Sequence, residues 1–151
     1  MPVFVVQKHK SSTLHYDFRL EIGNVLKSWA VPKGPTLDPS LKRLAVETAD
    51  HDMSYRYFEG VIPAGEYGAG EVIVWDSGEY ETASDVMEQY LSGNIEFTLK
   101  GKKLKGLFRL VKTVWKGKNA NWLLIKAHDI HISGDDILAV HPGSVLSIRR
   151  I

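Results

Sequence analysis

The clearest pattern in the chain is a strict alternation of apolar and polar residues over residues 14–21. One parity carries only apolar side chains: Leu14, Tyr16, Phe18 and Leu20. The other parity carries only polar ones: His15, Asp17, Arg19 and Glu21. A period of two is typical of a half-buried β-strand, whose successive side chains point to opposite faces. The pattern predicts a strand with one face in the core and a row of chemically active groups on the other.

Other short apolar runs predict that this strand lies in an antiparallel sheet. A β-branched run over residues 3–6 leads towards His9, and Gly23-Asn24 is a two-residue hairpin signal. The chain is therefore expected to return antiparallel over residues 25–31. Further strands are predicted over residues 43–48, 71–75, 79–81, 95–99, 104–114 and 122–126, with a turn at 76–78 and a polar loop or single turn at 49–55.

One stretch has the pattern of a helix. Residues 84–92 place Val86, Met87, Tyr90 and Leu91 on one stripe, Ser84 can cap the start, and Gly93 can close the end. Many strands, frequent turns and a single helix predict an all-β, mainly antiparallel fold. We expect a small closed or nearly closed β-barrel with one short helix, formed by one domain over residues 1–151.

Composition narrows the cellular setting. The chain has no cysteine, which excludes disulfides and thiolate metal sites. No apolar stretch is long enough for a spanning helix, and the start lacks a basic segment followed by a long apolar run. We therefore expect a cytoplasmic protein without membrane contact.

The net charge of +1 conceals a strong asymmetry along the chain. Residues 47–96 contain twelve acidic residues and one basic residue, Arg56. Residues 100–126 contain nine basic residues and no acidic ones. This distribution predicts one basic surface on an otherwise acidic body, although solvated strands also carry lysines without any such role.

The candidate chemistry begins with His9, which lies six residues before His15, so that a short bend can return it beside His15 and Asp17. Two imidazoles and a carboxylate are metal ligands, and three protein ligands leave positions open for a reactant. This N/O set suits Mn²⁺, Fe²⁺, Co²⁺ or Zn²⁺ without choosing among them. The competing interpretation is a surface ladder of paired charges on a solvated strand.

Several further side chains suit a phosphate. Arg19 on the same strand face, with Lys33 and Arg43 from neighbouring elements, can neutralise a phosphate as charge develops on it. His51 can act as a general acid or bind the phosphate, and Tyr55, four residues on, can donate a hydrogen bond. Taken singly, Lys33 and Arg43 are also consistent with surface charges, and His51 with a loop histidine. The remaining histidines are expected to be structural or exposed: His128, His131 and His141.

Several of these motifs, in this order, resemble the 3′-phosphoesterase domain of bacterial and archaeal DNA ligase D. The first motifs that show this resemblance are Phe4-Val-Val-Gln-Lys-His9 and Leu14-His-Tyr-Asp-Phe-Arg-Leu-Glu21. The resemblance continues almost to the end of the chain, through Lys27-Ser-Trp-Ala-Val-Pro-Lys-Gly-Pro35, Lys42-Arg-Leu-Ala45, Asp50-His51, Phe58-Glu-Gly-Val-Ile-Pro-Ala-Gly-Glu-Tyr-Gly68 and Trp122-Leu-Leu-Ile-Lys126.

The resemblance implies a small β-barrel hydrolase that heals 3′ ends in DNA break repair. Such enzymes remove a terminal 3′ ribonucleoside and then the remaining 3′-phosphate, which leaves a 3′-OH. The resemblance also implies manganese as the metal, with Co²⁺ and Zn²⁺ as alternatives, and places His9, His15 and Asp17 on the metal ligands. It places Arg19, His51 and Tyr55 around the scissile phosphate. Lys33 and Arg43 fall on accessory positions that matter more for one of the two reactions.

Two departures from the family pattern bear on the balance between these reactions. Members embedded in the full ligase carry a longer charged N-terminal arm, whereas eight residues precede His9 here. The acidic residue usual before the Asp-His pair is Ala49. We expect a stand-alone enzyme acting on DNA or RNA–DNA primer-template 3′ ends, with any ligase, polymerase/primase and Ku supplied in trans.

Two other classes of function also fit parts of the pattern. His15-Tyr-Asp17 with His9 or His51 can form the facial triad of a non-haem Fe(II) oxygenase on a β-barrel, with Arg19, Lys33 and Arg43 binding an oxoacid. Alternatively, a non-catalytic module can grip nucleic acid through the basic residues between Lys100 and Lys126.

Overall fold

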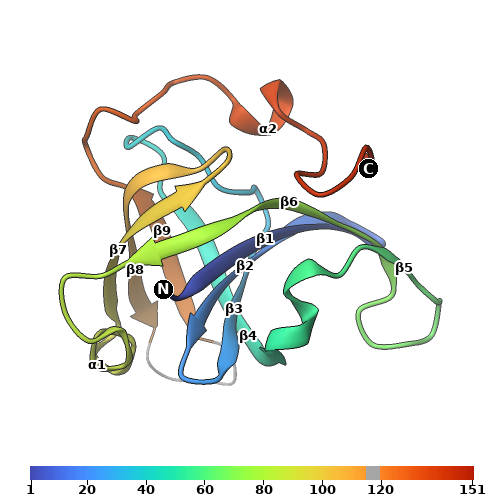
Figure 1. Cartoon of the computed structure of the whole chain (residues 1–151), viewed down its shortest axis with the longest axis horizontal. Helices are drawn as coiled ribbons and strands as arrows, with labels where there is room; N and C mark the ends of the chain where they lie inside the picture. Colours follow the sequence, from blue (N-terminus) through green and yellow to red (C-terminus); the bar gives the residue numbers. More distant parts are fainter. Residues whose placement is uncertain (115–119) are drawn as a thin grey trace.

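Antiparallel pairing runs around a complete ring of eight strands in the computed structural model, which describes residues 1–114 and 120–151 (Figure 1). The order around the ring is β1-β2-β3-β4-β9-β8-β7-β6, and β6 pairs with β1 to close it. The ninth strand, β5, pairs with β6 outside the ring. The strands are β1 (Val3–Lys10), β2 (Leu14–Ile22), β3 (Val25–Val31), β4 (Arg43–Asp52), β5 (Gly60–Ile62), β6 (Gly70–Glu81), β7 (Asn94–Gly101), β8 (Lys105–Val114) and β9 (Asn121–Lys126).

The barrel interior is filled by apolar side chains, chiefly aromatic ones. The predicted inward parity of β2 is confirmed from its second member on, because Tyr16, Phe18 and Leu20 are buried while Leu14 is 46 % exposed at the rim. Ring contacts link the strands across the core, as between Phe18 and Phe97 with centroids 5.8 Å apart. The largest interior side chains are Phe4, Phe18, Trp29, Trp75, Tyr80, Phe97, Phe108 and Trp122.

The first hairpin differs from its predicted form. β1 does not end near residue 6 but continues to Lys10, so that His9 and His15 are directly paired across β1 and β2. The strand can continue because β6 pairs with its other edge and satisfies its backbone groups. The two histidines therefore come together through strand register rather than through a bend.

The turn predicted at residues 76–78 is wrong, since β6 runs unbroken through it. The carboxylate of Asp76 is buried and accepts hydrogen bonds from the backbone N–H groups of Lys102, Lys103 and Leu104 in the β7–β8 turn. Gly78 is needed because a Cβ there would lie 2.2 Å from the Lys100 carbonyl oxygen. Asp76 and Gly78 are residue types common in turns, but here they contact the β7–β8 hairpin, which is distant in sequence.

β4 is also longer than predicted and carries His51, which is therefore a strand residue and not a loop residue. The 3₁₀-helix η1 (Met53–Tyr57) follows directly, and the Asp52 carboxylate caps its start by accepting from the Ser54 N–H. β4 can continue because the β3–β4 register shifts between Leu26 and Ser28, which keeps the two strands paired as far as Asp52.

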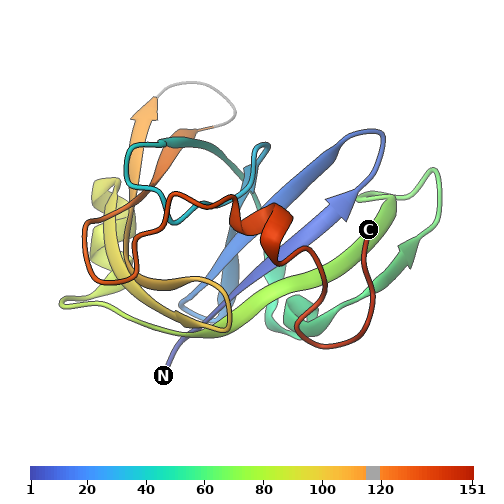
Figure 2. The ribbon, with the colours of Figure 1, turned by 90° about the horizontal axis from the view of Figure 1, so that it is seen from above.

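The predicted helix is present as α1 (Val86–Ser92), but Asp85 rather than Ser84 is its N-cap. Gly93 closes it in the left-handed conformation, as expected. Of the predicted apolar stripe, Leu91 is exposed, whereas Val86 and Tyr90 pack against the core. One further helical turn, α2 (Ile137–Val140), lies in the C-terminal segment that crosses β6 (Figure 2). No helix in the described ranges is long and apolar enough to span a membrane.

Three cations of the basic segment have partners within the fold, and the single basic surface expected from composition stays a prediction. Lys126 is buried and bonds to the Asp129 carboxylate at 2.7 Å. Lys103 donates to the carbonyl groups of His141 and Gly143 in the C-terminal segment. Lys100 pairs with Glu81. Lys116 and Lys118 lie outside the described residues.

Candidate functional site

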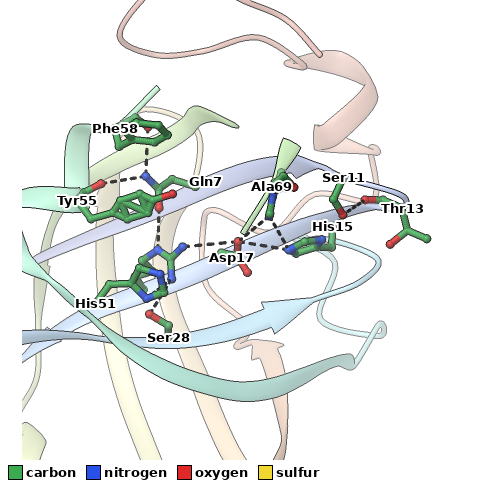
Figure 3. Close-up of polar contacts among 12 residues, drawn as sticks. Gln7, Ser11, Thr13, His15, Asp17, Ser28, His51, Tyr55, Phe58 and Ala69 are labelled. Atoms are coloured by element: carbon green, nitrogen blue, oxygen red, sulfur yellow. Dashed lines mark hydrogen bonds and ion pairs between the residues drawn. The ribbon is translucent and has the colours of Figure 1, made fainter. Parts of the chain in front are cut away.

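The polar face of β2 points away from the barrel core into a cavity of about 180 Å³ on the outer wall. β1 to β4 form the floor of this cavity, and η1 together with the loop between β5 and β6 forms its other side (Figure 3). Its lining residues are His9, His15, Asp17, Arg19, Ala30, Thr48, His51, Tyr55, Tyr67, Gly68 and Val72. The structure therefore brings together all six side chains that the sequence predicts to be central to the site.

His9, His15 and Asp17 present three ligand atoms to one another. His9 Nδ1 and His15 Nε2 lie 3.2 Å apart, and Asp17 Oδ2 lies 3.3 Å from His15 Nε2 and 3.7 Å from His9 Nδ1. The other ring nitrogen of His9, Nε2, lies 3.0 Å from the Ala69 carbonyl oxygen. A carbonyl oxygen can only accept a hydrogen bond, so Nε2 is the donor. This bond fixes the tautomer in which the lone pair of Nδ1 points at the other two groups.

This donor set fits a divalent cation. Ligand atoms about 2.1 Å from a tetrahedral metal are separated by roughly 3.4 Å, and the three separations bracket that value. Burial acts to raise the pKa of Asp17, but its hydrogen bond to His15 and the charges of Arg19 and both imidazoles outweigh burial and lower the pKa. The carboxylate is therefore ionised at neutral pH. These three residues are the ones that could hold a metal.

Arg19 is held beside this triad by side chains from three other elements. Its Nε donates to Gln7 Oε1 at 2.7 Å, and its Nη1 donates to Ser28 Oγ at 2.8 Å. Nη1 also lies 3.1 Å from His51 Nδ1, and Nη2 lies 3.6 Å from Asp17 Oδ2. Arg19 is only 3 % exposed yet lines the cavity, so its guanidinium is already desolvated and oriented for an anion.

Gln7 and Ser28 were missed by sequence reasoning. Gln7 is fully buried, and its Nε2 donates to the backbone carbonyl groups of Tyr55 and Phe58, so it joins Arg19 to η1 (Figure 3). Its signal was a single amide in an apolar run, on the same strand parity as His9. Ser28 had no signal beyond a small polar residue in a strand.

His51 and Tyr55 stack, with ring centroids 5.0 Å apart and planes at 12°. The prediction that they lie together is confirmed, although a strand and a 3₁₀-helix place them rather than one helical turn. Burial, followed by the charge of Arg19, lowers the pKa of His51, so the imidazole is neutral at pH 7. Burial raises the pKa of Tyr55, so the phenol keeps its proton and can donate it in a hydrogen bond.

We expect an NMR titration to give His51 a pKa below 6.5, the value of an unperturbed histidine. The unfolded chain then binds a proton that the folded chain excludes, so the contribution of His51 to stability is present above pH 6.5 and is lost as the pH falls. Absence of the resonance from His51→Gln assigns it. A pKa above 6.5 would contradict the neutral state inferred here.

Lys33 and Arg43 are not among the residues that line the cavity in the described part of the chain. Lys33 is exposed in the turn after β3, and Arg43 is half-buried at the start of β4. The Nε of Arg43 is buried without a hydrogen-bond partner among the described residues. The accessory roles expected for these two cations stay predictions. His128, His131 and His141 are exposed, as expected.

The chain is similar to known proteins of one family. A family model described as the DNA ligase D 3′-phosphoesterase domain matches residues 7–112. The multifunctional non-homologous end joining protein LigD of Pseudomonas aeruginosa is 50 % identical over 151 residues, which cover 98 % of this chain and 18 % of that protein. LigD proteins of Mycobacterium tuberculosis and Mycolicibacterium smegmatis are each 46 % identical, over 73 % and 83 % of this chain and 14 % and 17 % of their own length. The chain therefore spans less than a fifth of the curated relatives it matches.

Proposed function

The chain belongs to the family of DNA ligase D 3′-phosphoesterase domains, and from this premise we propose that it is a metal-dependent hydrolase that heals DNA 3′ ends for non-homologous end joining. It removes a terminal 3′ ribonucleoside from a DNA or RNA–DNA primer-template and then the remaining 3′-phosphate. The product is a 3′-OH that a ligase or polymerase can use.

The observation that supports this proposal most is the position of Arg19 beside the His9–His15–Asp17 triad. The Arg19 guanidinium lies 3.6 Å from the Asp17 carboxylate, so an anion bound to Arg19 also lies next to a cation held by the triad. A phosphate ester is an anion that needs both. An isolated metal site or an isolated arginine would not favour this chemistry over others.

We propose that His9, His15 and Asp17 hold Mn²⁺, with Co²⁺ and Zn²⁺ as alternatives. A bound divalent ion supplies Lewis acidity towards a phosphoryl oxygen and lowers the pKa of water. Arg19 binds the phosphate oxygens and stabilises the charge that develops on them. His51 Nδ1 lies 3.1 Å from Arg19 Nη1 and also 3.1 Å from the Ala49 carbonyl oxygen. In the tautomer in which Nδ1 accepts from Arg19, the proton is on Nε2, which can donate a hydrogen bond to the ester oxygen that leaves. The Tyr55 phenol donates a hydrogen bond to the phosphate.

The proposed setting is the cytoplasm, where the partners would be other components of end joining. A ligase, a polymerase/primase and Ku are the proposed ones, because they would act before or after a 3′ end is healed. The names of the LigD relatives include non-homologous end joining, which supports this choice of partners.

The test uses 5′-labelled primer-templates that end in one ribonucleotide or in a 3′-phosphate. Incubated with Mn²⁺, Co²⁺ or Zn²⁺, the first is expected to be shortened and then dephosphorylated, and the second to be dephosphorylated only. Chelation of the metal is expected to stop both reactions. Hydrolysis that survives full chelation would contradict the metal assignment, and a substrate left intact with every metal would contradict the proposed function.

The same ligand set suits the Fe(II) oxygenase considered above, because its metal sites also use two histidines and one carboxylate. Uptake of O₂ that depends on an oxoacid, with no release of phosphate, would favour that function. A module that binds only through the basic segment is less consistent with a buried Lys126.

A further inference from the structure

Tyr67 lines the cavity of the site although its side chain is largely in solvent. It is 83 % exposed, and it belongs to the loop between β5 and β6 that faces the metal-ligand triad. An exposed aromatic ring gains little from the fold itself, since it buries almost no apolar surface. A ring kept at the mouth of a charged cavity is therefore a candidate for contact with the substrate.

The loop that carries Tyr67 is held against the site. The Glu66 N–H donates to the Pro63 carbonyl, and the Ala69 N–H donates to the Glu66 carbonyl, so residues 63–69 form two successive turns. The Ala69 carbonyl in turn accepts from His9 Nε2 at 3.0 Å. Tyr67 is thus two residues from a direct hydrogen bond to the triad, which holds this part of the loop beside the site.

The location of the ring suits a base next to that phosphate. Tyr67 lines the same cavity as the phosphate-binding groups Arg19 and Tyr55. Its faces remain open to solvent, unlike those of Tyr55, which stacks on His51. A nucleoside whose phosphate lies at Arg19 would bring its base to this open ring.

We propose that, in the step that removes the 3′-phosphate, Tyr67 stacks on the base of the 3′-terminal nucleoside whose 3′ oxygen carries that phosphate. This inference rests on the proposed function. The last base of a strand has one face without a neighbouring base in its own strand, and an aromatic ring can cover that face. Stacking of this kind tolerates any base, because every base has a π-face. Tyr67 therefore recognises the strand end itself, whereas an internal phosphodiester offers no free base face.

The first test is a binding measurement with a duplex whose 3′-phosphorylated end carries 2-aminopurine, a base whose fluorescence falls on stacking. Stopped-flow mixing reads the signal before any turnover. Wild-type protein is expected to quench it, Tyr67→Phe and Tyr67→Trp to keep the quenching, and Tyr67→Ala to lose it with about tenfold weaker binding. Tyr57→Ala is the matched control, because Tyr57 is exposed but does not line the cavity.

The second test compares hydrolysis of a 3′-phosphate on a normal terminal nucleoside and on an abasic one. Wild-type protein is expected to prefer the normal end about tenfold in kcat/KM, and Tyr67→Ala to lose that preference. Equal quenching by wild type and Tyr67→Ala would overturn the proposal. So would equal losses in Tyr67→Phe and Tyr67→Ala, since they would assign the role to the hydroxyl. A wild-type protein that quenches but never hydrolyses would overturn the proposed function and leave the stacking contact standing.

Discussion

Asp17→Ala is expected to reduce hydrolysis of a 3′-phosphate by on the order of 10³-fold or more. The Asp17 carboxylate is the only negative charge in the triad, and it contacts both imidazoles and Arg19. Without it, two imidazoles and a nearby guanidinium remain, which is an unfavourable environment for a divalent cation. Titration calorimetry with Mn²⁺ is expected to show the binding lost along with the activity.

Glu21→Ala is the matched control for this loss. Glu21 is on the same face of β2, four residues further on, but it accepts from the Val3 N–H and does not line the cavity. Its removal is expected to leave metal binding unchanged. If Asp17→Ala kept both its activity and its affinity for Mn²⁺, the triad would not be the metal site.

Arg19→Lys is expected to lower kcat/KM by about 10²–10³-fold although the positive charge is kept. A lysine cannot reproduce the fork of bonds to Gln7, Ser28 and His51, and it binds a phosphate as a point charge instead of a planar donor. The substitution also leaves a buried amide and hydroxyl without their partner. A stability loss of about 2–4 kcal/mol is therefore expected in urea unfolding.

Inhibition by inorganic phosphate separates the two effects of this substitution, because it reports the anion site without any chemistry. Arg109→Lys is the control, since Arg109 is exposed on β8, away from the cavity. Arg19→Lys with a wild-type inhibition constant for phosphate would show that Arg19 only supports the fold.

Local patterns predicted those parts of the fold that depend on local sequence. The alternation over residues 14–21 gave β2 and its buried face, and Gly23-Asn24 gave the hairpin to β3, because strand parity and turn conformation are set within a few residues. The closed or nearly closed barrel, predicted from the number of strands and turns, is likewise confirmed by the closed ring of strands. These features need no knowledge of distant contacts.

The errors occur where a residue serves a partner far away in the chain. Asp76 resembled part of a turn because its role is to accept from backbone groups 26 to 28 residues later. Lys126 resembled a surface cation, but its buried ammonium group bonds to Asp129 and to two carbonyl groups. No periodicity within one strand could indicate either arrangement.

The site was predictable to a similar extent. Its charged residues stood out by type, and the meeting of His9 with His15 followed from their separation, although strand register was the actual cause. Gln7 was missed because a single amide in an apolar run has no chemical signature of its own. Tyr67 was missed because a glycine-rich loop has no periodicity that would show where its side chain lies.

The position of the site on the outer wall of β2 gives that strand two functions in one stretch of nine residues. Deletion or insertion of a single residue early in β2 would exchange its faces, turning Phe18 outward and driving Asp17 and Arg19 into the aromatic interior. Such a shift of register would disrupt the core and the site at the same time, so neither could be lost without the other. Length variation in this family should therefore be absent from β2 and concentrated in the connections between strands.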